Sequence, residues 1–225
     1  ILHFKSIASY QASDTYEKFF LLNPDFLIQL AKEYILHLQF AVKLMHAGKA
    51  RAVGQSRAVR RGMDILEHVS REAPGLVEPY LILAHTQFTL GEFEAATRVV
   101  NIALNFDTRS ASVHLLAAQL ALANGNTRGA GGALDQATAC EFQVRKAPAY
   151  ALVKAELYLL AEDLEGALKI LRDAIQLPGI RDIVTTQGVV PVSERVAVFV
   201  NLANVLSGLN RFAEAASILA EARVR

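Results

Sequence analysis

Alanine recurs at three fixed positions along most of the chain, and this repetition constrains the fold more than any other feature. The set Ala84, Ala96, Ala103 recurs after 34 residues, after a further 37, and after a further 48. The full set of twelve is Ala84, Ala96, Ala103, Ala118, Ala130, Ala137, Ala155, Ala167, Ala174, Ala203, Ala215 and Ala222. Self-similarity with a period of this length is typical of a repeat architecture.

The spacing within each unit predicts a helix, a tight turn and a second helix. The second and third alanines of a unit lie seven residues apart, so they fall on one helical face. The first alanine lies on a separate helix before the turn, where Gly91 and Gly125 indicate a positive φ. Small residues let the two helices approach closely, and neighbouring units must stack because none buries its apolar face alone.

The sequence therefore predicts an all-α chain, a superhelical solenoid whose units resemble the tetratricopeptide repeat. Its hydrophobic content of 52%, without tryptophan and with only six prolines, also favours packed helices. We expect one solenoid domain. Its repeats span 24–76, 77–110, 111–147, 148–179 and 195–225; residues 1–22 hold the second helix of an earlier repeat, and residues 180–194 form an extended loop.

The first repeat carries an insertion. Its first-helix alanine is Ala31, which lies 53 residues before Ala84 instead of 34. Gly62 and Val69 take the places of the second-helix alanines. The sequence thus predicts 19 extra residues between the two helices of this repeat.

A glycine-rich stretch, "NGNTRGAGGALDQA" at residues 124–137, raises the question of a phosphate-binding loop. It lacks the third glycine of a dinucleotide fingerprint and the lysine of a P-loop, and the segment before it has helical periodicity. In the repeat register, Gly129, Gly131 and Gly132 fall inside a helix, where each costs about 1 kcal/mol relative to alanine. Our hypothesis is that these glycines leave the convex surface of the helix without side chains, so that another chain segment can approach it closely.

The residues of catalytic and metal sites do not form recognisable patterns. None of the six histidines lies three or four residues from another, so no helix face presents a pair of metal ligands. Cys140 is the single cysteine. We therefore expect no enzyme, no cofactor and no metal site. No apolar run is long enough to predict membrane insertion.

A basic stretch is the main charge feature. Residues 34–63 contain no Asp or Glu, although the net charge of the whole chain is only +1. This stretch offers two interpretations, a docking loop for an acidic partner or a solvated loop and helix face. Nucleic acid is not an expected partner, because no aromatic side chains alternate with the charges. The candidate binding residues are Lys49, Arg51, Arg57, Arg60 and Arg61.

A second set of candidate protein-binding residues comes from the register of the first helices, which line the groove of such a superhelix. These residues are Leu81, His85, Phe88, Leu115 and Gln119.

The segments in which the chain differs from a regular repeat pattern resemble one family. "NPDFLIQLAKEYI" at 23–35 precedes the insertion, and "SERVAVFVNLANVLSGLNRFAEAASIL" at 193–219 follows the loop. The segment "FQVRKAPAY" at 142–150 and "LPGIR" at 177–181 lie between repeats, where general repeat similarity would not produce them. This succession is similar to the middle of the tetratricopeptide repeat protein 21 family, a subunit of intraflagellar transport complex A. Because the chain starts at Ile1, we interpret it as a fragment.

The resemblance implies a non-enzymatic scaffold in retrograde transport along the cilium or flagellum and at the basal body, on the cytoplasmic side. Its implied partners are other complex A subunits, in which β-propellers precede helical repeats, with complex B and membrane-cargo adaptors as further partners. The alternative is a general tetratricopeptide-repeat module that captures a linear peptide in its groove.

Overall fold

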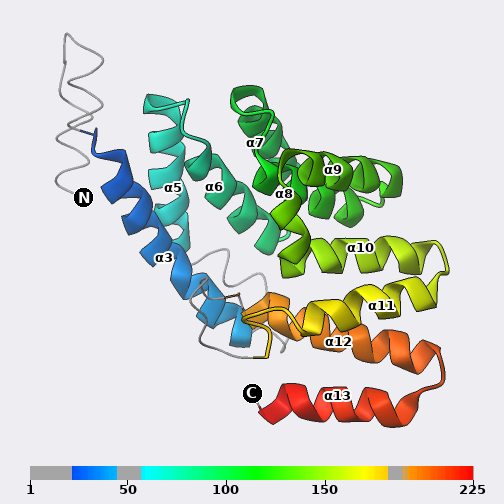
Figure 1. Ribbon diagram of the computed structural model, residues 1–225. Helices are drawn as coiled ribbons and strands as arrows, with labels where there is room; N and C mark the ends of the chain where they lie inside the picture. The colour runs from blue at the N-terminus through cyan, green and yellow to red at the C-terminus, as the bar shows by residue number, and fades with distance from the viewer. Residues whose placement is uncertain (1–21, 45–56, 182–189, 191, 225) are drawn as a thin grey trace. The chain divides into compact units, whose positions relative to one another are not determined.

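The computed structural model describes residues 22–44, 57–181, 190 and 192–224, and every regular element among these residues is a helix (Figure 1). The predicted all-α fold class is confirmed. The chain divides into two compact units, residues 1–108 and 109–225. The first unit contains α3 (Pro24–Leu44), α5 (Arg57–Glu72), α6 (Val77–Thr89) and α7 (Phe93–Phe106). The second contains α8 (Ala111–Ala123), α9 (Thr127–Cys140), the 3₁₀ helix η2 (Phe142–Lys146), α10 (Pro148–Leu160), α11 (Leu164–Ile175), α12 (Val192–Gly208) and α13 (Phe212–Val224).

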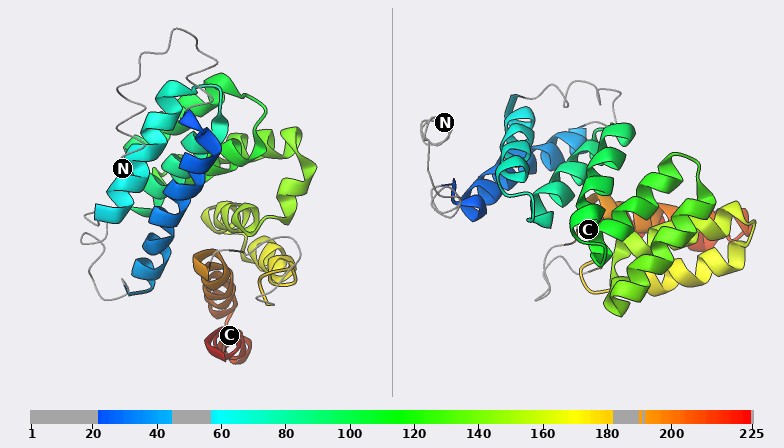
Figure 2. Two further views of the ribbon diagram at one scale, coloured as in Figure 1. Left: turned by 90° about the vertical axis from the view of Figure 1, so that its left-hand side faces the viewer. Right: turned by 90° about the horizontal axis from the view of Figure 1, so that it is seen from above.

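The described part of the first unit contains two helix pairs. Helix α3 packs against α5 and α6 packs against α7, and the α3–α5 pair lies side by side in each view (Figures 1 and 2). Ala31, Leu66 and Leu83 form a buried cluster that joins α3, α5 and α6. The first repeat is thus a true helix pair in spite of its insertion, most of which lies outside the described residues.

The second unit repeats the same arrangement three times. Helices α8 and α9, α10 and α11, and α12 and α13 form pairs, and α10 also contacts α8 and α12. Leu134 lies in the cluster between the first two pairs, and Leu171 and Leu202 lie in the larger cluster around the last two. Successive pairs therefore share their apolar faces, as stacked repeats must.

The alanines of the repeat lie where the helices of each pair meet. Ala84, Ala96, Ala118, Ala130, Ala137, Ala155 and Ala167 are fully buried, and Ala103, Ala174, Ala203 and Ala215 are at most 4% exposed. Ala222, in the last described helix, is half-buried. A side chain no larger than a methyl group is what such close helix packing accepts.

The turns inside four repeats have one common geometry. The equivalent residues Gly91, Gly125, Glu162 and Asn210 all adopt positive φ, at 79°, 73°, 60° and 61°. In each case the next residue's N–H donates to the carbonyl five positions back, for example Asp163 N to Tyr158 O at 2.9 Å. This is the hydrogen bond of a Schellman C-cap. The positive φ expected at the two glycines is confirmed, and two repeats adopt it without glycine.

Some predicted boundaries differ from the structure or lie outside it. Helix α12 begins at Val192, so the end of the segment expected as a loop at 180–194 is helical. Most of that segment, and residues 1–21 of the expected preceding helix, lie outside the described residues. Helix η2, within the repeat at 111–147, is not predicted from the sequence.

Candidate protein-binding surfaces

The start of the glycine-rich helix α9 is a capped helix terminus. Asn126 Oδ1 accepts a hydrogen bond from Gly129 N at 2.9 Å, and Asp163 does the same for Gly166 N at 2.8 Å one repeat later. A Cβ at Gly129 would meet Asn126 Cγ at 2.8 Å. Gly129 is therefore explained by its cap, since the capping side chain occupies the space of a Cβ. The equivalent residue of the next repeat, Gly166, is also a glycine behind a cap.

Gly131 and Gly132 have a different environment. Apart from the adjacent residues and the backbone of α9 itself, no described heavy atom lies within 4 Å of a Cβ built on either glycine. The hypothesis that a neighbouring segment of this chain approaches their surface is therefore wrong for the described part of the chain. Neither backbone geometry nor packing requires glycine at these two positions.

The predicted groove residues on α6 lie on one helical face. Leu81, His85 and Phe88 follow the spacing of four and three residues that brings side chains together. Leu81 and Phe88 are half-buried and His85 is exposed. The protein around His85 nevertheless lowers the pKa of its imidazole by desolvation. Phe88 contacts Phe93 of α7, with ring centroids 5.6 Å apart, so its ring is held by the helix pair.

The two groove candidates on α8 have different surroundings. Leu115 is only 8% exposed and packs in the core with Ala149 and Val153 of α10. It stabilises the repeat stack and is not presented to a partner. The prediction that Leu115 lines the groove is wrong. Which side of α8 is covered by α10 depends on tertiary packing, which the sequence register does not specify. Gln119 remains half-buried.

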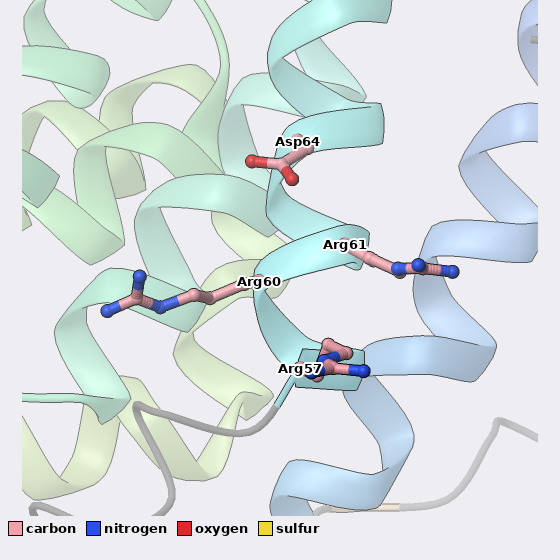
Figure 3. Close-up of a pocket in the computed structure, with 4 residues that line it drawn as sticks. All are labelled: Arg57, Arg60, Arg61 and Asp64. Atoms are coloured by element: carbon pink, nitrogen blue, oxygen red, sulfur yellow. The ribbon is translucent and has the colours of Figure 1, made fainter. Parts of the chain in front are cut away.

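The arginines of the basic stretch gather at the start of α5. Arg57, Arg60 and Arg61 are all exposed and line an open hollow of about 610 Å³ together with Asp64 (Figure 3). Lys49 and Arg51, the other two predicted residues, lie outside the described residues.

The segment that most resembled one family, residues 142–150, forms η2 and the start of α10. Phe142 is 64% exposed, and the Arg145 guanidinium lies 4.6 Å from the centre of its ring. Val144 and Tyr150 turn inward and pack against the core of the second unit. Pro148 is the first residue of α10. A backbone N–H at this position would have no carbonyl partner within the helix, so proline, which lacks the N–H, is well accepted there. The motif thus builds a connector with an aromatic side chain on its surface.

A cleft in the second unit, lined by both charged and apolar side chains, is not predicted from the sequence. Arg172 of α11 forms an ion pair with Glu214 of α13 at 2.9 Å, and Arg181 pairs with Glu221 at 3.0 Å. Arg172, Arg181 and Glu214 border a cleft of about 310 Å³ that is also lined by Leu202. The partners are about 40 residues apart in sequence, so only the stacking of repeats reveals the pairs.

Metal-ligating side chains do not gather in the described part of the chain. No group of three or more His, Cys, Asp and Glu side chains there could hold a metal ion. Cys140 is a half-buried free thiol. Within the same residues, no helix has the length and apolar character needed to cross a membrane.

Comparison with known proteins relates both units to one family. The model described as tetratricopeptide repeat protein 21 second ARM domain matches residues 2–125, and the model described as tetratricopeptide repeat protein 21 ARM repeat matches residues 142–225. Tetratricopeptide repeat protein 21A of Homo sapiens is 34% identical over 183 residues, covering 80% of this chain and 13% of that protein. Tetratricopeptide repeat protein 21B of Mus musculus is 30% identical over 206 residues, covering 89% and 15%.

Solved structures with the same fold are more distant in sequence. They include the Cut9–Hcn1 hetero-tetramer of the APC/C, with a TM-score of 0.64 and 15% identity over 90% of this chain and 37% of that one. A thermophilic TPR protein of Thermus thermophilus has a TM-score of 0.58 and 18% identity, covering 85% and 89%. This chain spans about one seventh of the length of its curated relatives. It is a helical-repeat segment and belongs to the tetratricopeptide repeat protein 21 family.

Proposed function

We propose that this chain is a non-enzymatic scaffold segment of intraflagellar transport complex A, which supports retrograde transport and cargo import through protein–protein contacts. The observation that carries the proposal is the match of family models to residues 2–125 and 142–225. The expected place of action is the cilium or flagellum and the basal body, on the cytoplasmic side. Other complex A subunits are the proposed partners, with complex B and membrane-cargo adaptors as further ones.

The repeat stack supports a scaffolding role physically. Its apolar residues are used in packing helix against helix, which leaves the outer faces of the helices for contact with other proteins. Polar features on these faces, such as the Arg172–Glu214 pair, are exposed. A scaffold needs packed helix pairs of this kind with a varied surface.

Peptide capture in the groove is the alternative. It requires a row of accessible anchors on successive first helices. The structure supplies an exposed His85 on α6 but buries Leu115 on α8. This burial makes the alternative the weaker of the two.

The scaffold proposal is tested by affinity purification of the tagged chain from ciliated cells, followed by mass spectrometry. We expect complex A subunits to co-purify. An Ala155→Asp variant is the control, because Ala155 is fully buried and an unpaired carboxylate there should unfold the stack. Recovery of the same proteins with both chains, or of no complex A subunit with the unchanged chain, contradicts the proposal.

A further inference from the structure

The arginine cluster at the start of α5 has a fan-like geometry. Arg60 and Asp64 project to one side of the helix, whereas Arg61 projects to the other side, toward α3 (Figure 3). Arg57 lies at the first residue of the helix. The three guanidinium groups therefore spread around the helix start and do not converge on one point.

The position of this cluster is unfavourable for helix stability. The first turn of a helix has a positive end potential, which favours acidic residues and disfavours basic ones. Helix α5 has no acidic residue in its first turn, as is also true of α8, α9 and α10, whereas α6, α7 and α11 begin with Glu78, Glu94 and Glu165. The helix dipole is thus no reason for Arg57 and Arg60 in the first turn, and Arg61 lies just beyond it.

Among the described residues, ion pairing does not account for Arg57 or Arg61. In the second unit Arg172 and Arg211 both pair with Glu214. Among the residues that the structure describes, by contrast, no ion pair engages Arg57 or Arg61. Both side chains are exposed and can meet a ligand.

We propose that Arg57, Arg60 and Arg61 bind an extended segment of a partner protein that is rich in Asp and Glu. The planar guanidinium group donates two parallel hydrogen bonds to a carboxylate. Because the three groups diverge, an extended chain with several carboxylates can engage all of them, whereas a single small anion cannot. Their proximity to the positive end of α5 adds to the attraction for negative charge.

The lining of the hollow favours a protein segment over other polyanions. Its described lining consists of Arg57, Arg60, Arg61 and Asp64, with no aromatic ring on which a nucleic-acid base could stack. Among the described residues, the lining also contains no apolar side chain of the kind that inserts into a lipid surface. The Asp64 carboxylate repels a polyanion whose negative charges follow one another closely. It is compatible with a peptide in which other residues separate the Asp and Glu side chains.

The test is fluorescence anisotropy with the complete chain and a labelled peptide of twelve residues in which Glu alternates with Gly and Ser. The variant R57Q/R60Q/R61Q should bind about tenfold more weakly, because each exposed pair contributes modestly. The matched control R71Q/R98Q/R128Q removes three other exposed arginines, one of which, Arg128, also lies in a first turn. It should change the dissociation constant less than about twofold. The thermal midpoint of the first variant should be equal to or above that of the unchanged chain, which separates lost binding from lost folding.

Equal weakening by both variants, or no binding of the peptide, overturns the proposal. Tighter binding to single-stranded DNA of matched charge or to phosphatidylserine vesicles also overturns it, because the surface then recognises another macromolecule. The proposal is independent of the ciliary role, since peptide binding is measured without other complex A subunits.

Discussion

Gly62 of α5 lies directly against Ala31 of α3. A Cβ on Gly62 would be 3.1 Å from the Ala31 carbonyl oxygen, 2.9 Å from Ile35 Cγ1 and 3.2 Å from Tyr34 Cβ. Helix α3 and helix α5 therefore approach so closely that even alanine is too large at this point. In the other repeats the equivalent residues Ala96, Ala130, Ala167 and Ala215 are buried alanines.

This contact predicts that Gly62→Ala destabilises the chain although alanine is the better helix former. Displacing α3 to make room should cost about 1–3 kcal/mol, as overpacking does. Urea denaturation followed by circular dichroism at the helical band measures the change. An unchanged or higher midpoint would show that the α3–α5 interface yields without cost.

The two unexplained glycines of α9 should behave in the opposite way. Gly131→Ala and Gly132→Ala introduce a methyl group into open space and restrict the unfolded chain. Each should stabilise the chain by about 0.5–1 kcal/mol. Gly129→Ala is the matched control on the same helix and should give no such gain, because its Cβ displaces the Asn126 cap. Thermal unfolding of the three variants distinguishes them, and equal gains at all three positions would contradict the role assigned to the cap.

The turns allow a paired test of backbone strain. Glu162 has a φ of 60° and Gly125 a φ of 73° at equivalent positions. A non-glycine residue in the left-handed region costs about 1–2 kcal/mol of stability. Glycine avoids this cost but loses more backbone entropy on folding, which cancels part of the gain. Glu162→Gly should therefore stabilise by about 0.5–1 kcal/mol, and Gly125→Ala should destabilise by about 1 kcal/mol. Shifts of the same sign, measured by urea unfolding, would mean that the turns are not equivalent.

Stability should decrease when the solution becomes mildly acidic. Desolvation by burial lowers the pKa of His68, where Glu72 opposes and Arg71 adds to the effect, and desolvation also lowers the pKa of His85. The unfolded chain then binds more protons just below pH 6.5, so stability is fully present above that value and is lost as the pH falls toward the lowered pKa values. A H68Q/H85Q variant should show a smaller drop in melting temperature between about pH 7.5 and about pH 5.5. An equally large drop in the variant would assign the pH dependence to other groups.

Much of the fold can be predicted from the sequence because each repeat has the same local geometry, which the regular spacing of small residues specifies. The alanine register identifies the helix pairs, the small position at Gly62 and the positive φ of Gly91 and Gly125, since each depends on contacts within one helix–turn–helix unit. The register also removes the phosphate-loop interpretation of the glycine-rich stretch. The family resemblance rests on segments between repeats, which periodicity does not explain.

The tertiary structure decided the features that depend on contacts between units of sequence. It buried Leu115 under α10, although the sequence placed that residue in the groove. It also joined Arg172 to Glu214 across 42 residues. Hydrophobic periodicity specifies which face of a helix is apolar, but which neighbour covers that face, and which charges then meet, is set by how successive helix pairs stack.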